Sequence, residues 1–184
     1  LPDVPDSLAY AKILLEYGKG ISFARLGRHA EAELSLQKMN QLLKENERLK
    51  IRMGAFNTAY AGGEIAITML RGIIAEEKNN LDEAIGLLSE AVKLEDGLIY
   101  DEPRDWLLPV RQYLASVYIK KGYFDEAESM LRQDLRINPD NGWALTGLWI
   151  ILNKKGNKQE ATKMKNALDA LRNQQDFNKN GPVF

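Results

Sequence analysis

The chain has 184 residues, no cysteine and a single histidine, and its 25 basic side chains nearly balance its 26 acidic ones. This length predicts one domain with a hydrophobic core, while the near-neutral charge argues against a general polyanion binder. The lack of cysteine excludes disulfides and thiolate zinc sites, and no apolar run approaches the roughly 18–20 residues of a membrane-spanning helix. Because the chain starts with leucine and carries no signal-like segment, we expect it to be part of something longer, and its compartment stays open.

Hydrophobic residues recur at helical spacing along the chain, and no segment shows the sustained alternation of a strand. The stretch from 29 to 48, for example, is apolar at Leu36, Met39 and Leu43 with charged residues between them. In chain order, the predicted helices cover residues 7–26, 29–48, 57–78, 81–95, 105–121, 124–137, 141–155 and 158–173. We therefore predict an all-α protein without a sheet, in which Asp105 caps the fifth helix.

A recurring pattern groups these helices into pairs. The second helix of each pair carries an anchoring alanine, and these alanines are spaced by 52, 43 and 34 residues: Ala32, Ala84, Ala127 and Ala161. The turn inside a pair needs a left-handed residue that ends the first helix, and this place is filled by Gly27, Asn79-Asn80, Gly122 and Gly156. Small residues at Gly20 and Gly72 would let the helices of a pair approach closely. This pattern resembles the tetratricopeptide repeat, a unit of about 34 residues.

The resemblance implies an α-α superhelix, a right-handed solenoid of about four helix pairs. Its repeats are expected near 8–48, 57–95, 105–139 and 141–173, within one solenoid over 1–175 that is followed by a polar tail at 176–184. The motifs YDEPRDW and NPDNGW resemble the C-terminal part of a longer bacterial multi-repeat protein. That likeness brings no established activity with it.

The family resemblance also implies a binding surface, because the first helices of tetratricopeptide pairs line a concave groove that usually holds an extended peptide or a helix. Projecting the repeat register onto this chain gives a groove of apolar and aromatic side chains with a few charges. The predicted groove residues are Tyr17, Ile21, Arg25, Met69, Ile73, Gln112, Lys120, Trp143, Ile150, Asn153 and Lys154.

The segment before the fifth helix is the other candidate site, because it mixes two aromatic residues with carboxylates and an arginine. It comprises Tyr100, Asp101, Glu102, Arg104, Asp105 and Trp106, with Arg111 and Asp134 as expected partners. Asp134 stands where the repeat prefers alanine, which directs a carboxylate at a helix interface. A structural ion-pair network accounts for this set because buried charges need partners, and a small-molecule pocket is the alternative.

Catalysis is hard to place in this sequence, because His29 is the only histidine and lies in a turn between helices. A histidine metal site fails for the same reason, so we predict no metal, no cofactor and no enzymatic activity. The leading interpretation is a protein-interaction module or scaffold, and the alternative is a regulatory domain that binds a small molecule at residues 100–106. The expected partner is another protein or the upstream part of the same chain, with neither nucleic acid nor membrane. A homodimer could form through exposed terminal helices, where Leu1, Val4 and Leu8 begin an apolar face.

Overall fold

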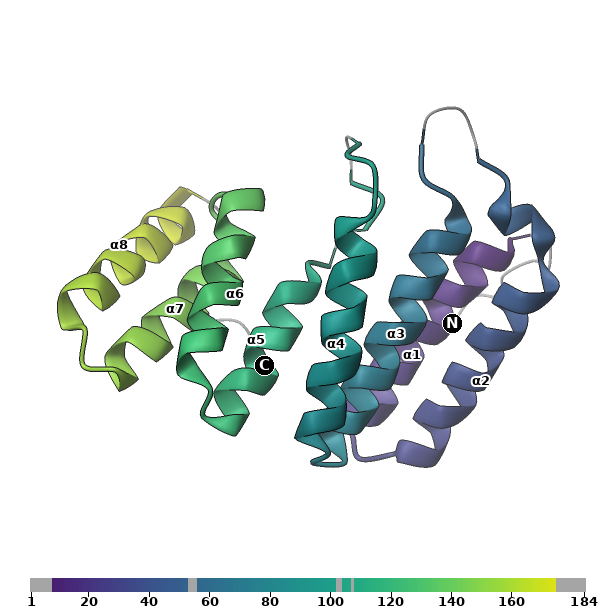
Figure 1. Ribbon diagram of the computed structural model, residues 1–184, viewed down its shortest axis with the longest axis horizontal. Helices are drawn as coiled ribbons and strands as arrows, with labels where there is room; N and C mark the ends of the chain where they lie inside the picture. Colours follow the sequence, from purple (N-terminus) through teal and green to yellow (C-terminus); the bar gives the residue numbers. More distant parts are fainter. Residues whose placement is uncertain (1–7, 53–55, 102–103, 107, 175–184) are drawn as a thin grey trace. The chain divides into compact units, whose positions relative to one another are not determined.

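The computed structural model describes residues 8–52, 56–101, 104–106 and 108–174, and it confirms the all-α prediction: every regular element in these residues is helical. Figure 1 shows the helices running back and forth in consecutive pairs. Their bounds are α1 Ala9–Arg25, α2 His29–Glu45, α3 Ala59–Glu77, α4 Leu81–Asp96, α5 Val110–Lys121, α6 Phe124–Ile137, α7 Gly142–Lys154 and α8 Lys158–Gln174, with a short 3-10 helix, η1, at Glu47–Lys50. None of the described helices is both long and apolar enough to cross a membrane.

The turn inside each pair closes as the sequence predicts. Gly27, Gly122 and Gly156 have φ angles of 71°, 82° and 77°, and Asn79 takes the same left-handed conformation at 63°. In every case the residue after the left-handed one donates its N–H to a carbonyl five residues earlier, as Arg28 does to Phe23 at 2.8 Å. This bond satisfies a carbonyl that the helix end would otherwise leave unpaired.

The fifth helix begins later than predicted. It starts at Val110 rather than near residue 105, so Asp105 does not cap it. Instead, a carboxylate oxygen of Glu95, from the end of α4, accepts the Val110 N–H at 3.1 Å. A residue distant in sequence thus supplies the acceptor that an N-terminal helical N–H requires.

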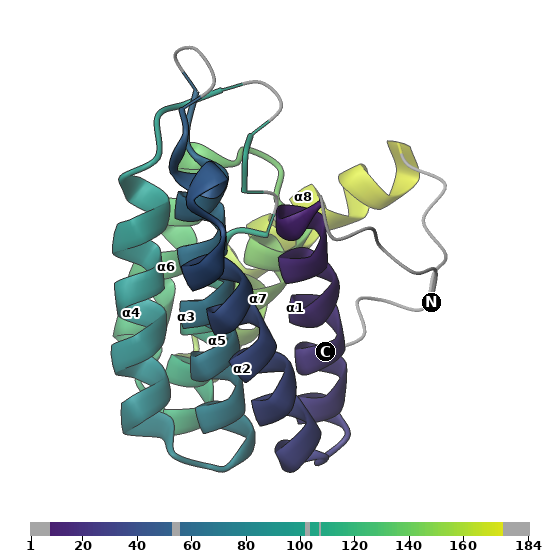
Figure 2. The same ribbon diagram turned by 90° about the vertical axis from the view of Figure 1, so that its right-hand side faces the viewer.

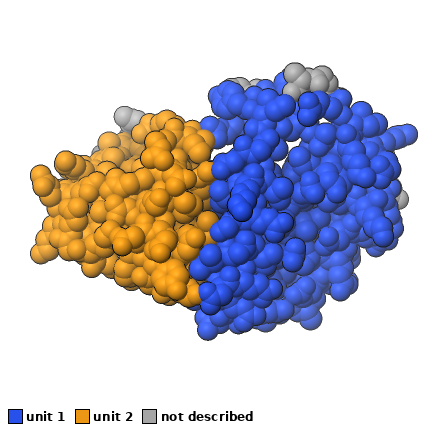
Figure 3. Space-filling view, viewed as in Figure 1, with its two compact units in different colours: residues 1–110 blue, residues 111–184 orange. Residues whose placement is uncertain are grey.

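The chain divides into two compact units, residues 1–110 and residues 111–184, which are coloured separately in Figure 3. The single solenoid expected over 1–175 stays a prediction. In the first unit, α1 packs on α2 and α3, and α3 packs on α4 (Figure 2). Its core contains fully buried side chains from all four helices, among them Ile13, Met39, Ile65, Met69, Leu70 and Leu88.

Glycines set the spacing of this first core. A Cβ added at Gly72 would lie 2.8 Å from Leu88 Cγ, so the α3–α4 pair depends on a bare backbone there, as predicted. A Cβ at Gly20 would lie 2.5 Å from Leu70 Cδ2. Gly20 therefore lets α1 approach α3, the first helix of the next pair, rather than its own partner α2.

The second unit has its own core, formed where α5, α6, α7 and α8 meet. Leu131, Leu148, Ile151 and Leu152 are almost completely buried there. Four alanines from the four helices allow the close packing: Ala115, Ala127, Ala144 and Ala161.

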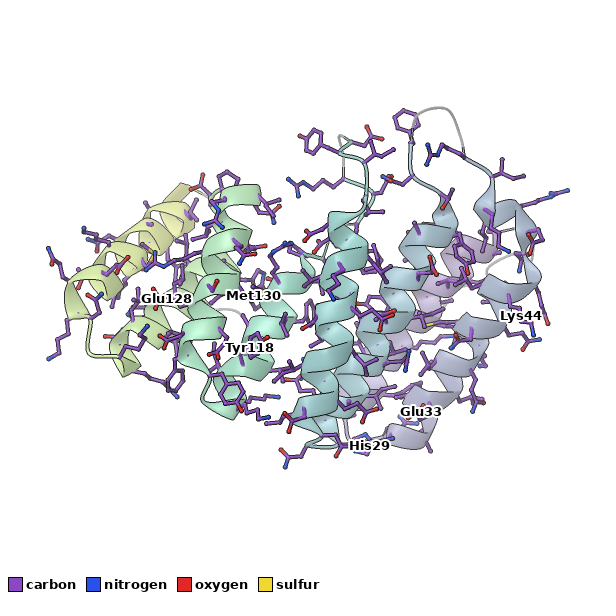
Figure 4. The ribbon with its side chains drawn as sticks, viewed as in Figure 1. His29, Glu33, Lys44, Tyr118, Glu128 and Met130 are labelled. Carbon is purple, nitrogen blue, oxygen red and sulfur yellow. The ribbon has the colours of Figure 1, made fainter. Side chains whose placement is uncertain are left out.

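An ion-pair network ties α6 to the following pair in this unit. Glu128, labelled in Figure 4, accepts hydrogen bonds from Lys155 Nζ at 2.7 Å and from Arg132 Nε at 2.9 Å. Arg132 also donates to Glu160 of α8 at 2.6 Å. The hydrogen bond from Lys155 lowers the pKa of Glu128 below its ordinary value of 4.5, and Arg132 adds to this effect, while burial opposes it.

We expect this network to make the stability of the chain pH-dependent. A carboxyl whose folded pKa is lowered stabilises the folded state above its ordinary pKa, and that contribution disappears as the pH falls through the folded value. Glu128→Gln should therefore lower the free energy of unfolding at pH 7, with a difference from wild type that shrinks as the pH falls below 4.5 and through the lowered folded pKa. Urea denaturation at pH 7 and at a series of lower pH values measures this. Glu126→Gln, at an exposed neighbour, is the matched control, and an equal pH dependence of its difference would contradict the prediction.

Candidate functional site

The first part of the predicted groove is closed rather than open. Tyr17 on α1 is 4% exposed, and Met69 and Ile73 on α3 are fully buried. The Tyr17 hydroxyl donates to Met69 Sδ at 3.5 Å, which joins α1 to α3. The expectation that these three side chains face an open groove is wrong, because they are core residues of the first unit.

Trp106 explains why Tyr17 is covered. Its ring lies 5.6 Å from the Tyr17 ring, centroid to centroid, at an interplanar angle of 58°, and the indole is only 6% exposed. Sequence reasoning put Tyr17 and Trp106 into two separate candidate sites. The structure brings them together, since the segment before α5 places Trp106 against Tyr17 of α1.

Asn57, just before α3, anchors that segment. Its Nδ2 donates to the Ile99 carbonyl at 2.8 Å, and its Oδ1 accepts the Ile99 N–H at 2.8 Å. The same Nδ2 also lies 2.7 Å from a carboxylate oxygen of Asp105. One amide side chain therefore holds the backbone of one loop residue and the carboxylate of another. The two connecting stretches before α3 and after α4 lie at the same end of this unit (Figure 1).

The remaining loop residues interact with one another. Arg104 places its guanidinium 5.5 Å from the centre of the Tyr100 ring, which is 67% exposed. Asp101 is half-buried, and Glu102 lies outside the described residues. Burial raises the pKa of Tyr10 on α1, and the nearby negative charge of Asp105 raises this pKa further. These contacts favour a structural network within the first unit over a small-molecule pocket.

Asp134 and Arg111 belong to the second unit and are both buried, at 1% and 7% exposure. Asp134 accepts hydrogen bonds from Asn138 Nδ2 at 2.9 Å and from Asn141 Nδ2 at 2.6 Å. The amide oxygen of Asn141 in turn accepts the Trp143 N–H at the start of α7. The carboxylate that replaces the usual alanine thus organises the turn between α6 and α7, while its pairing with the loop stays a prediction.

The part of the groove predicted in the second unit is more open. Trp143, in the first turn of α7, is 39% exposed. On the same helix Ile150 is half-buried, and Asn153 and Lys154 are exposed. Lys154 Nζ lies 5.3 Å from the centre of the Phe124 ring. On α5, Gln112 is half-buried and Lys120 is exposed.

The other predicted groove residues lie on α1. Ile21 is half-buried, and Arg25 pairs with two carboxylates of α3, those of Glu76 at 3.3 Å and Glu77. This pairing links the ends of two helices, so the guanidinium is already engaged within the fold.

Within the described residues, no group of three or more metal-ligating side chains gathers into a site. Figure 4 shows His29 where α2 begins, one turn ahead of Glu33. His29 is half-buried.

Comparison with known proteins confirms the kind of repeat. A tetratricopeptide repeat model matches residues 114–142, which cover most of the α5–α6 pair and the turn to α7. No curated protein sequence matches the chain.

Solved structures confirm the fold. A kinesin light chain of Podosopora anserina with nearly identical TPR-like repeats aligns with a TM-score of 0.59 at 15% identity, covering 98% of this chain and 82% of its own. MamA from AMB-1 aligns with a TM-score of 0.54 at 19% identity, covering 90% and 75%. The C-terminal TPR-containing domain of a Plasmodium falciparum FK506-binding protein gives 0.50 at 15% identity, covering 86% and 97%. The chain thus has the helix-pair fold of tetratricopeptide proteins.

Proposed function

We propose that this tetratricopeptide-type chain is a protein-interaction module, and that the α5 and α7 surface of its second unit holds a peptide or a helix of another protein. We call this surface the Trp143 face; it comprises Gln112, Lys120, Trp143, Ile150, Asn153 and Lys154. The fold supports an interaction role in general, because stacked helix pairs present extended surfaces that bind other proteins. The contacts of the candidate residues described above also support a non-enzymatic scaffold, since these side chains form packing contacts and ion pairs.

The exposure of Trp143 is the observation that carries this proposal. Tryptophan is the residue type most enriched among those that dominate the binding energy of interfaces. Ile150 follows seven residues later, two helical turns along, and therefore falls on the same side of α7. An amphipathic helix or an extended apolar segment could cover both side chains.

The basic residues of the Trp143 face indicate the charge of the expected partner. Lys120 and Lys154 are exposed basic side chains of this face, and Asn153 adds an exposed amide. Opposite charges across an interface speed association and select partners more than they raise affinity. The partner segment is therefore expected to combine apolar anchors with flanking carboxylates.

A second copy of the chain is another partner of the same class. Leu8 and Leu14 lie at the start of α1 and are 53% and 39% exposed. Covering them would remove apolar surface from water, which favours self-association through this helix. Sedimentation of wild type against a Leu8→Lys variant tests this second proposal.

The proposal is tested by capture from lysate of the source cells with tagged wild type and a Trp143→Ala variant. Loss of an interface tryptophan typically costs 2 kcal/mol or more, so we expect capture of the specific partner to fall by about tenfold or more. Leu26→Ala is the control, because Leu26 is 71% exposed, lies in the α1–α2 turn of the first unit and is not part of the Trp143 face. Equal recovery with all three proteins, at equal helical content by circular dichroism, would show that this face does not bind the partner.

A further inference from the structure

One end of the first unit carries a group of exposed apolar side chains. The stretches before α3 and after α4 both lie at this end, beyond the tips of the helices (Figure 1, Figure 2). Their large hydrophobic residues are open to solvent: Ile51 is 63% exposed, Phe56 50%, Ile99 49% and Tyr100 67%. We call these four residues the loop-end face. Single exposed apolar residues are ordinary, but a group of them marks an interaction surface.

Hydrogen bonds join the two stretches that form the loop-end face. The Asn57 side chain binds both the N–H and the carbonyl of Ile99 at 2.8 Å. Phe56 directly precedes Asn57, and Tyr100 directly follows Ile99, so these bonds bring apolar residues of both stretches to one place. The face is therefore one surface, although the residues that link its halves are 42 positions apart in sequence.

Opposite charges flank the loop-end face. Residues 46–52 carry three basic side chains and one acidic one, whereas residues 95–105 carry five carboxylates and one arginine. Arg48 and Arg52 are exposed, and neither pairs with a carboxylate in the described part of the chain. A basic flank is thus available on one side of the apolar residues and an acidic flank on the other.

These charges favour a second copy of the chain over other occupants of the face. Across a two-fold axis each copy uses the same surface, so the basic stretch of one copy would face the acidic stretch of the other. A foreign protein would need its own matching pair of charged stretches. The two stretches together carry six carboxylates and four basic side chains, which disfavours an anionic membrane surface.

We infer that the loop-end face is a self-association surface, on which a second copy of this chain packs its own loop-end face about a two-fold axis. The four apolar side chains form the centre of this interface. Arg48 and Arg52 of each copy then lie opposite Asp96 and Asp101 of the other.

The size of the face sets the expected strength of association. Covering its four side chains would bury on the order of 500 Å² per copy. A standard interface buries roughly 800 Å² per partner, so we expect a dimer whose population depends on concentration. The inference places self-association at a different surface from the α1 side proposed above, and it does not depend on the Trp143 face.

Sedimentation equilibrium of the full chain over a range of concentrations tests the inference. For wild type we expect the average mass to rise with concentration from 20.8 kDa toward twice this value. Phe56→Asp puts a charge into the apolar centre and should weaken association by about tenfold or more. Leu34→Asp is the matched control, because Leu34 is also 50% exposed but lies on α2 outside the face. It should associate as wild type does.

An exchange of charges tests the two-fold arrangement itself. Arg48→Glu/Arg52→Glu and Asp96→Lys/Asp101→Lys should each associate less than wild type, because each double variant places like charges opposite each other. An equimolar mixture of the two should recover association, since the reversed stretches are again complementary. A mixture that stays monomeric at native helical content would contradict the two-fold arrangement.

Two further results would overturn the inference. One is a wild type that stays monomeric up to about 1 mM. The other is association that Phe56→Asp leaves unchanged and Leu14→Asp removes, because this would place the contact on the side of α1. Tyr100→Asp repeats the test if Phe56→Asp loses helical content by circular dichroism. None of these variants alters the Trp143 face, so failure here is distinguishable from failure of the capture experiment.

Discussion

Replacing Gly72 by valine is expected to lower the free energy of unfolding by about 2 kcal/mol, near the middle of the range for overpacked cores. The added Cβ would lie 2.8 Å from Leu88 Cγ and 3.0 Å from Leu88 Cδ2. Leu88 is fully buried, so it has no free space into which to turn. The Cγ atom is the branch point of that side chain, and moving it forces α3 and α4 apart or Leu88 out of its rotamer. Urea denaturation followed by circular dichroism measures the loss.

Gly86→Ala is the matched control for this pair of helices. Gly86 lies in the middle of α4, is exposed, and would have no neighbour within 4 Å of an added Cβ. Alanine at such a helix position should raise stability by about 0.5–1 kcal/mol. If Gly72→Val and Gly86→Ala changed stability in the same direction, close helix approach at Gly72 would not be what spaces this pair.

Leu148→Ala should cost about 2–5 kcal/mol, because it leaves a cavity in the centre of the second unit. Leu148 is fully buried and belongs to the cluster that includes Ala115, Leu131 and Ala161, so the site has neighbours from every helix of the unit. The alanines of this cluster have no side chains long enough to fill the gap. Denaturant unfolding measures the total loss in free energy of unfolding. Native-state hydrogen exchange shows which helices lose amide protection.

The loss of stability after Leu148→Ala is expected to differ between the two units. Each unit has its own core, so we expect amide protection to fall more in α6, α7 and α8 than in α1 to α4. Ile137→Ala, at a residue 39% exposed at the end of α6, serves as the control and should cost less than about 1 kcal/mol. Uniform loss of protection along the chain after Leu148→Ala would contradict separate cores.

The elements predicted best were those whose signals are local. The α6 bounds, Phe124–Ile137, agree with the predicted 124–137. Gly122 ends the helix before α6, and Asn138 directly follows the last residue of α6. Asn79 was expected to replace glycine in its turn, and its φ of 63° confirms this. Backbone conformation at such positions depends on the residue itself, so a sequence pattern can reveal it.

The candidate site was predicted less well, because its contacts join residues far apart in sequence. The start of α5 depends on Glu95, fifteen residues away, and not on the nearer Asp105. The burial of Tyr17 depends on Trp106, and repeat register alone cannot foresee that a loop residue fills a groove position. Asn57 carried no signal in the sequence, since a single asparagine before a helix has many ordinary roles.

The most direct test of the interaction role is photo-crosslinking from position 143. The full chain with benzoylphenylalanine in place of Trp143 is irradiated in lysate of the source cells, beside the same chain labelled at Leu34, which is 50% exposed on α2. Our account predicts one protein crosslinked from position 143 and absent from the Leu34 sample, with the linkage mapping to a segment that combines apolar and acidic residues. The same crosslinked products from both positions, or none from position 143, would contradict a partner-binding Trp143 face.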